Sequence, residues 1–435
     1  MSMTFSLLLF PLVLFLLITG QPIAFILGGV GVVLTYFLWE PHALNMVAHR
    51  IFHLMSSYTV VCVGMFIFMG VLLERCGMVN DLFKVIYLWS GRLRGGLAVG
   101  TVAICMLFSA MTGVSGPTAA IMGLTTLPEM LKRNYDKQIA LGCISAGAAL
   151  GILIPPSVTM VIYAIIAEES VGHLFAGGII PGLLLGFLFS IYIILRCLFQ
   201  PNLAPTLPPE ERATWLEKII SLKGIILPLC LIFAVMGTIF LGVATPTEAS
   251  GAGAFGAIII AAIYKKLNWA LIKEACFRTA RVSAMGLWIY VGALVFTTVY
   301  AATGAQQQVA NLLLTIPGEW GPIIAMQIIW IVLGCFIDPW GIIMLTAPVF
   351  LPVIAELNLS FVWFGVLFIM NMQMAYITPP FGFDLFYLKG VAPPEVSLVD
   401  IYKSVWPFFF CQLLGLTLVI LFPQLVLWLP GIIFG

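Results

Sequence analysis

The chain has 435 residues, of which 62% are hydrophobic and 9% are charged, and its formal net charge at neutral pH is +1. Soluble domains carry about 25% charged residues, so this composition excludes a soluble globular protein and indicates an all-α polytopic membrane protein. The balanced charge argues against nucleic acid as a partner.

We expect about ten membrane spans, because a span needs roughly 20 apolar residues. No basic region precedes the first apolar run, which is therefore typical of a span rather than of a cleaved signal peptide. The expected spans cover residues 3–19, 22–39, 51–73, 138–167, 174–199, 224–243, 247–264, 282–303, 361–388 and 404–429.

Two further apolar stretches, residues 97–131 and 320–357, are each long enough to enter the membrane twice. Residues that break helices interrupt both stretches at their centres. We therefore expect two re-entrant helical hairpins with their tips near the bilayer midplane. The interrupting residues are Gly113, Ser115, Gly116 and Pro117 in the first stretch, and Asp338, Pro339 and Gly341 in the second.

A proline pair stands in the middle of two of the expected spans, at residues 155–156 and 379–380. Proline removes a backbone donor and clashes with the carbonyl four residues earlier, so we expect helix breaks at residues 151–157 and 378–381. A plain kink is the alternative. Irregular backbone at membrane depth is tolerated only where protein buries it or where it lines a cavity. The two breaks thus predict the midplane binding site of a secondary transporter.

Prolines recur along the chain at one offset, since 246 − 22, 352 − 128 and 379 − 155 all equal 224. Short amphipathic helices expected at residues 78–89 and 306–314, each preceded by a glycine, also correspond. We interpret this pattern as an internal duplication. Residues 1–199 form the first half, residues 200–223 form a polar linker, and residues 224–435 form the second half.

Basic residues indicate that the two halves are inverted. Lys132, Arg133 and Lys137 follow the first hairpin, whereas Lys389 and Lys403 follow the second broken span, and the matching loops have no basic residue. By the positive-inside rule, the linker and the ends of the first hairpin lie in the cytoplasm, and both termini lie outside. A further basic loop is expected at residues 265–281. The loop that matches it in the first half, residues 40–50, contributes only Arg50.

An inverted repeat would bring two tips and two breaks to one point. The free carbonyls of helix C-termini, with hydroxyls and a carboxylate, suit Na⁺, and free N–H groups at helix N-termini suit a carboxylate. No arginine is expected near the breaks. The candidate residues for binding substrate or Na⁺ are Thr112, Ser115, Gly116, Thr118, Gly151, Pro155, Pro156, Ser157, Asp338, Pro339, Thr378, Pro379, Pro380 and Asp384, with Ser115, Thr118, Asp338 and Thr378 as the Na⁺ ligands.

Structural roles are the alternatives for these side chains. Asp338 would then cap a helix, and Asp384 would face a basic partner near the cytoplasmic interface. Ser115 and Thr118 would only pack between helices. Glu248 follows a proline at an expected helix start, where capping is the favoured interpretation. Residues 251–256 fit G-x-G-x-x-G, but they lie inside an apolar span, where small residues pack helices together.

Four segments resemble the large membrane subunit (M subunit) of tripartite ATP-independent periplasmic (TRAP) transporters. They are TGQPIAFILGG at residues 19–29, SGPTAAIMGLTTLPEM at 115–130, LGILIPPSVTMVIYAIIAEESVGHLFAGGIIPG at 150–182 and YITPPFGFDLFYLKGVAP at 376–393. The resemblance implies an ion-transporter-type elevator fold in the bacterial inner membrane. It also implies Na⁺ coupling and uptake of an organic acid, such as a dicarboxylate, delivered by a periplasmic substrate-binding protein. A small four-span membrane subunit would be the further partner.

The chain departs from that pattern at the first tip, which is poor in serine, and at Asp384, where an asparagine or apolar residue is more usual. Trp340, Phe381 and Phe383 make the site more aromatic, which favours a bulkier or less charged acid. A stand-alone anion:sodium symporter and a passive channel are the alternative functions. An enzyme is the weakest interpretation, because the four histidines lie near expected span ends without a nucleophile–base pair, and no cofactor other than the coupling Na⁺ is expected.

Overall fold

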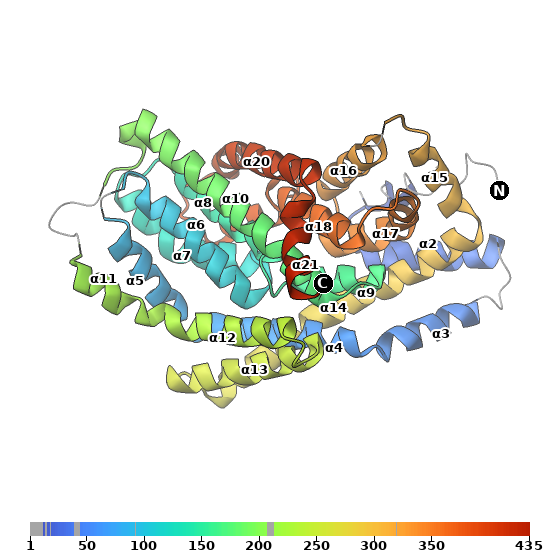
Figure 1. The fold of residues 1–435 in the computed structure, drawn as a ribbon, viewed down its shortest axis with the longest axis horizontal. Helices are drawn as coiled ribbons and strands as arrows, with labels where there is room; N and C mark the ends of the chain where they lie inside the picture. The colour runs from blue at the N-terminus through green and yellow to red at the C-terminus, as the bar shows by residue number, and fades with distance from the viewer. Residues whose placement is uncertain are drawn as a thin grey trace.

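The computed structural model describes residues 12–13, 15–17, 19–38, 44–91, 93–206, 213–318 and 320–435, and these residues form helices and turns without a β-strand (Figure 1). The helices of the first part are α2 (Ile23–Leu38), α3 (Leu44–Met55), α4 (Tyr58–Arg75), α5 (Met78–Trp89), α6 (Gly96–Thr112), α7 (Ser115–Lys132), α8 (Lys137–Ala149), η2 (Leu150–Ile152), α9 (Val158–Ala167), α10 (Val171–Phe199) and η3 (Pro201–Leu203). Those of the second part are α11 (Trp215–Ser221), α12 (Lys223–Phe240), α13 (Pro246–Ile263), α14 (Trp269–Ala302), α15 (Ala305–Leu314), α16 (Gly321–Gly334), α17 (Pro339–Glu356), α18 (Phe361–Ile377), α19 (Phe383–Val391), α20 (Leu398–Leu421) and α21 (Gln424–Ile433).

Seven helices of the described residues are long and apolar enough to cross a membrane: α4, α10, the joined α11–α12, α13, α14, α17 and α20. Shorter apolar helices, among them α2, α8, α9, α16 and α18, accompany them. The prediction of an all-α polytopic membrane protein is therefore confirmed. The first expected span, residues 3–19, lies largely outside the described residues.

The order of elements repeats along the chain. The helices α6 to α10 form a hairpin, a broken helix and a long helix, and α16 to α20 form the same series. Both α7 and α17 have 18 residues, and their first residues are 339 − 115 = 224 positions apart. Asp136 and Ser360, which cap α8 and α18, are also 224 positions apart. The packing is reciprocal as well, because α2 packs along α14 and α13 along α4.

Both hairpins form where the sequence predicted them. The turn between α6 and α7 contains Gly113, whose φ of +64° is a left-handed conformation that glycine adopts without a steric cost. The turn between α16 and α17 ends at Asp338, which is the N-cap of α17. The two expected amphipathic helices are α5 and α15, each preceded by a glycine of positive φ.

Both helix breaks are also confirmed. Helix α8 ends at Ala149, continues as the single turn η2, and gives way to an irregular segment before α9 starts at Val158. The side chain of Ser157 caps α9 by accepting a hydrogen bond from the Met160 N–H at 3.3 Å. The second break separates α18 from α19 at residues 378–382, and the peptide bonds Pro155–Pro156 and Pro379–Pro380 are both cis.

Several expected helix ends were wrong. The span expected at 51–73 is divided between α3 and α4 near Ser57, and the span expected at 404–429 is divided near Pro423. Helix α14 begins at Trp269, capped by Asn268, and therefore contains most of the expected basic loop. The expected linker contains η3 and α11, and Thr214 and Glu217 form a capping box at the start of α11. The charged and polar residues of these segments cap helices or lie within them, whereas the sequence interpretation assigned them to loops.

Two smaller predictions on α13 are confirmed. Glu248 accepts hydrogen bonds from the Thr245 backbone N–H and hydroxyl, each at 2.8 Å, in a capping box. Two glycines of the G-x-G-x-x-G match face neighbouring helices: a Cβ on Gly253 would lie 2.8 Å from the Met69 sulfur of α4, and one on Gly256 would lie 2.5 Å from Leu231 of α12. This glycine pattern therefore serves helix packing.

Candidate functional site

The two hairpin tips and the segment around the first break meet at a cavity of about 190 Å³. Helices α4 and α14 close its other side. Its walls are formed by Ile67, Gly70, Val71, Glu74, Thr112, Gly113, Val114, Pro117, Ile152, Val158, Thr159, Arg278, Val282, Met285, Asp338, Trp340, Tyr376, Phe383 and Tyr387.

The N-terminus of α7 faces this cavity without a side-chain cap. Its N-cap residue is Val114, in extended conformation, which offers no side-chain acceptor to the first N–H groups of the helix. The neighbouring Thr112 hydroxyl donates to the Val114 carbonyl at 3.1 Å instead. Uncapped N–H groups at a helix start, reinforced by the helix dipole, attract an anion.

The N-terminus of α17 has the opposite character. The Asp338 carboxylate accepts hydrogen bonds from the Trp340 and Gly341 N–H groups at 3.1 and 3.2 Å. Asp338 thus has the capping role considered from the sequence, and it also lines the cavity. The two tips are therefore unequal, because one offers free donors and the other already holds a negative charge.

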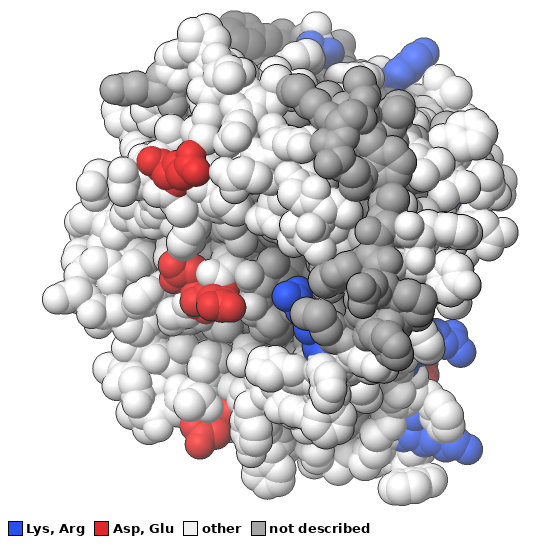
Figure 2. Space-filling view, turned by 90° about the vertical axis from the view of Figure 1, so that its right-hand side faces the viewer, with Lys and Arg blue, Asp and Glu red and all other residues white. Residues whose placement is uncertain are grey.

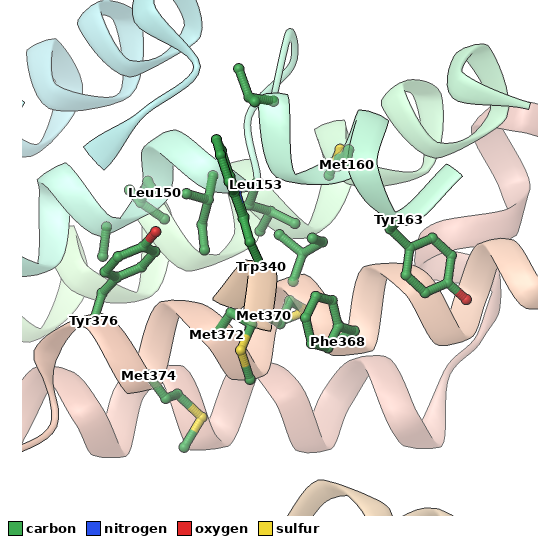
Figure 3. Close-up of a cluster of buried hydrophobic side chains, with 14 of the residues drawn as sticks. Leu150, Leu153, Met160, Tyr163, Trp340, Phe368, Met370, Met372, Met374 and Tyr376 are labelled. Atoms are coloured by element: carbon green, nitrogen blue, oxygen red, sulfur yellow. The ribbon is translucent and has the colours of Figure 1, made fainter. Parts of the chain in front are cut away.

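Trp340 connects the second tip to the first break. Its indole N–H donates to the Thr159 hydroxyl of α9 at 3.4 Å, and in Figure 3 its ring reaches toward Leu150 and Leu153. The ring also packs against Gly286 of α14, where a Cβ would lie 2.3 Å from it. Trp340 lines a second, mainly apolar cavity of about 280 Å³ between α4, α9 and α14. The indole therefore separates two cavities.

Asp384 does not line the cavity but lies buried behind the first tip. Its exposed fraction is 0%, and neither carboxyl oxygen has a hydrogen-bond partner of normal geometry. The Ser115 side chain lies close enough to interact with Asp384, and its Oγ is likewise buried without a hydrogen-bond partner of normal geometry. No lysine or arginine pairs with Asp384 among the described residues, so the basic partner considered as the alternative role is not found in that part of the chain.

The other candidates divide into several groups. Thr112 and Asp338 line the cavity. The Thr118 and Thr378 hydroxyls donate to carbonyls of their own helices, at Val114 and Met374, which leaves their oxygen lone pairs available, so the set of four Na⁺ ligands stays a prediction. Six further candidates are buried and do not line the cavity: Gly116, Gly151, Pro155, Pro156, Ser157 and Pro339. Pro379 is half-buried and Pro380 is exposed.

The expectation that no arginine lies near the breaks was wrong. Arg278 lines the cavity, where its Nη1 donates to Glu74 Oε1 at 3.0 Å. The sequence interpretation placed Arg278 in a loop, because α14 continues well past the apolar run into a charged segment. Glu74 was also missed. A pair of opposite charges near the ends of two expected neighbouring helices was the available signal.

Comparison with known proteins identifies the family. Residues 10–425 match the family described as tripartite ATP-independent periplasmic transporter, DctM component. The chain is 31% identical to the C4-dicarboxylate TRAP transporter large permease protein DctM of Pseudomonas aeruginosa, over 93% of each chain. It is also 31% identical to the ectoine TRAP transporter large permease protein TeaC of Halomonas elongata, over 86% of this chain and 87% of that one.

The fold also has solved relatives. The YdaH transporter of Alcanivorax borkumensis aligns with a TM-score of 0.58 and 16% identity, over 94% of this chain and 97% of that chain. Both chains therefore share an overall helical architecture. The repeated order of elements, with its two broken helices, agrees with a match to one family over residues 10–425. The chain therefore belongs to the tripartite ATP-independent periplasmic transporters, as their large membrane permease subunit.

Proposed function

We propose that this chain is the translocating subunit of a Na⁺-coupled importer of small organic acids. A periplasmic substrate-binding protein would deliver the acid, and a small four-span membrane subunit would complete the complex in the bacterial inner membrane. The observation that carries the proposal is the charge of the cavity: an uncapped helix start that suits an anion stands beside carboxylates that repel one.

The anion site is supported by the start of α7. Relatives of this chain are named for C4-dicarboxylate and for ectoine, which are small acids. The cavity of about 190 Å³ is smaller than the roughly 300–1,000 Å³ of pockets for drug-sized ligands, and this supports a small substrate. Its size therefore opposes the bulkier acid that the aromatic residues suggested.

The need for a cation follows from the charges. Glu74, Asp338 and Arg278 give the cavity wall a formal charge of −1 before any substrate enters. An added carboxylate would be repelled strongly in this poorly hydrated space unless a cation accompanies it. The buried Asp384 carboxylate and the Ser115 hydroxyl, both without partners, supply oxygen ligands of the kind that hard cations prefer. We place the coupling Na⁺ there.

The orientation and movement belong to the same proposal. Residues 1–199 and 224–435 would lie inverted across the membrane, with the segment 200–223 in the cytoplasm and both termini in the periplasm. The hairpins and broken helices would move as one body against α4 and α14, in the manner of an elevator.

Uptake by proteoliposomes that contain both membrane subunits tests this function. With the loaded binding protein outside, labelled succinate or ectoine should enter saturably and only under an inward Na⁺ gradient. Asp384→Asn and Ser115→Ala should lower the apparent Na⁺ affinity by about tenfold or more, because the first removes the charge and the second removes an oxygen ligand of a buried cation. Ser283→Ala is the matched control, because the Ser283 Oγ is also buried and unpaired but lies in α14, which packs mainly against α2, α4 and α17.

The same assay separates the alternatives. Equal uptake without the binding protein would indicate a stand-alone symporter, and flux that rises linearly with concentration would indicate a channel. Uptake that is indifferent to Na⁺ in the wild-type complex would contradict the coupling.

A further inference from the structure

Two ion pairs of opposite polarity join α4 to α14, and their residues are adjacent on α4 and one turn apart on α14. Glu74 pairs with Arg278 at 3.0 Å, and Arg75 pairs with Glu274 at 2.6 Å. Both side chains of the second pair are about half exposed, at 47% and 44%, and neither lines the cavity. The first pair lines the cavity, and its Glu74 side chain is only 11% exposed. The chain thus contains a cavity pair and an outer pair that link the same two helices.

Arg278 is the basic residue among the cavity walls, and its guanidinium is not saturated. Its side chain is 38% exposed, more than three times the fraction of its partner. A guanidinium carries five N–H donors in a planar fork. Within the described residues, the guanidinium donates one hydrogen bond, from Nη1 to Glu74 Oε1. The remaining donors are available to a carboxylate or sulfonate, which guanidinium binds in a bidentate manner.

The position of Arg278 complements the anion site at the first tip. Gly113 and Val114 form one part of the wall, where α7 begins without a cap, and Arg278 comes from α14 on the other side of the same cavity. An acid between them would meet N–H donors from a hairpin and a guanidinium from the helix that the hairpin faces. Glu74 competes with that acid for the same guanidinium.

We infer that Arg278 is a specificity-determining residue that binds an anionic group of the substrate, and that Glu74 is the competing carboxylate that holds Arg278 while the cavity is empty. This inference rests on the proposed function, because it requires an acidic substrate. When the carboxylate of the substrate replaces that of Glu74, the Arg278 guanidinium stays paired, so its charge is never left unpaired. Competition by Glu74 also lowers the affinity of Arg278 for the acid and therefore favours release of the acid.

Opposite effects of the two partners test the inference. In the proteoliposome assay, Arg278→Gln should raise the KM for succinate or ectoine by about tenfold or more, because a charge-assisted hydrogen bond is lost. Glu74→Gln should lower the KM and also lower the maximal rate, because the freed guanidinium holds the acid longer. Arg278→Lys keeps the charge without the fork, and its KM should lie between those of wild type and Arg278→Gln. Arg75→Gln and Glu274→Gln are the matched controls and should change KM less than twofold, as exposed pairs contribute little.

The outcomes separate this inference from the function on which it rests. If wild-type vesicles take up the acid but Arg278→Gln and Glu74→Gln both raise KM, or both behave like the outer-pair variants, the pair only joins two helices and the inference is wrong while the function stands. If wild-type vesicles take up neither acid with its binding protein, the proposed function fails and the inference with it. Elution of each variant complex as a single species in size-exclusion chromatography identifies any variant that has failed to fold.

Discussion

Two aspartates near the hairpin tips have different physical surroundings, and this difference determines what each can do. Asp338 is half-buried at the cavity, and two backbone N–H groups already stabilise its charge. Asp384 is fully buried, and no lysine or arginine of the described chain pairs with it. An isolated buried carboxylate is costly, so Asp384 has the stronger requirement for a bound cation. Asp338 contributes negative charge to the cavity and order to the second tip.

Substitution of Asp338 can separate these two contributions. Asparagine is as good an N-cap as aspartate, whereas alanine loses the cap at a cost of about 0.5–2 kcal/mol. We expect Asp338→Asn to melt like wild type and Asp338→Ala to be less stable by that amount. Both variants should lose most of their Na⁺-dependent uptake, because both lose the negative charge of Asp338 that makes entry of the acid depend on an accompanying cation. Normal uptake by Asp338→Asn would restrict Asp338 to capping.

At this scale the sequence identified carboxylates and hydroxyls better than it identified their roles. Asp338 and Asp384 stood out because charge is rare within apolar runs. Arg278 was missed because its neighbours in sequence are charged too, so hydropathy gave no reason to place it inside a helix. The unequal tips did have a signal in the sequence, since Asp338 supplies a side-chain acceptor at the N-cap of α17 and Val114 supplies none at the N-cap of α7, but the exact start of each helix was not known.

The interrupted helices show which features at the level of elements sequence can predict. A proline pair removes donors and excludes the helical conformation wherever it occurs, so both breaks could be placed to within a few residues. Helix ends were less predictable. A turn at Ser57 and a cap at Asn268 change the chain direction without altering mean hydropathy, and α3, α14 and α21 were misplaced for that reason.

Removal of the first proline pair tests whether the break is needed. In Pro155→Ala/Pro156→Ala, α8 should continue toward α9, which would displace Ile152 and Val158 from the cavity wall. We expect normal membrane insertion and a loss of uptake of about tenfold or more, because site groups displaced by about 1 Å can cost far more than that. Pro128→Ala is the control, because α7 continues through Pro128 without a break. Normal uptake by the double variant would make the break incidental.

At the scale of the whole molecule, charge and helix packing are unevenly distributed. Figure 2 shows the end that carries α15 and the N-terminal helices: most of its surface is uncharged, and the acidic side chains lie toward one side. The helices α5, α7 and α11 come together at the opposite end of the molecule, far from α15 and α3 (Figure 1).

The repeat that relates the two halves was predictable from the spacing of prolines. The close packing of the hairpins against α4 and α14 was not predictable, because the sequence of an apolar run does not show which residues its glycines contact.

That fit allows the proposed movement to be tested. Gly70 of α4 lies against the Thr112 backbone at the first tip, and Gly286 of α14 lies against the Trp340 ring at the second. Because glycines have no side chain, the hairpins approach these two helices more closely than any other residue would allow. If the hairpins slide past α4 and α14 during transport, a methyl group at Gly286 should obstruct Trp340 in the arrangement seen here and leave other arrangements unaffected.

We therefore expect Gly286→Ala to slow uptake by about fivefold or more, since overpacking costs typically 1–3 kcal/mol in the obstructed state. Adding Trp340→Ala should restore much of the rate, because the clash then has no second partner, although the loss of the indole also joins the two cavities that it separates. Gly251→Ala in α13 is the matched control, because nothing lies within 4 Å of its Cβ position. Uptake by Gly286→Ala at the wild-type rate would show that this contact does not limit the transport cycle, and the sliding surface would then have to lie elsewhere than between α14 and the second tip.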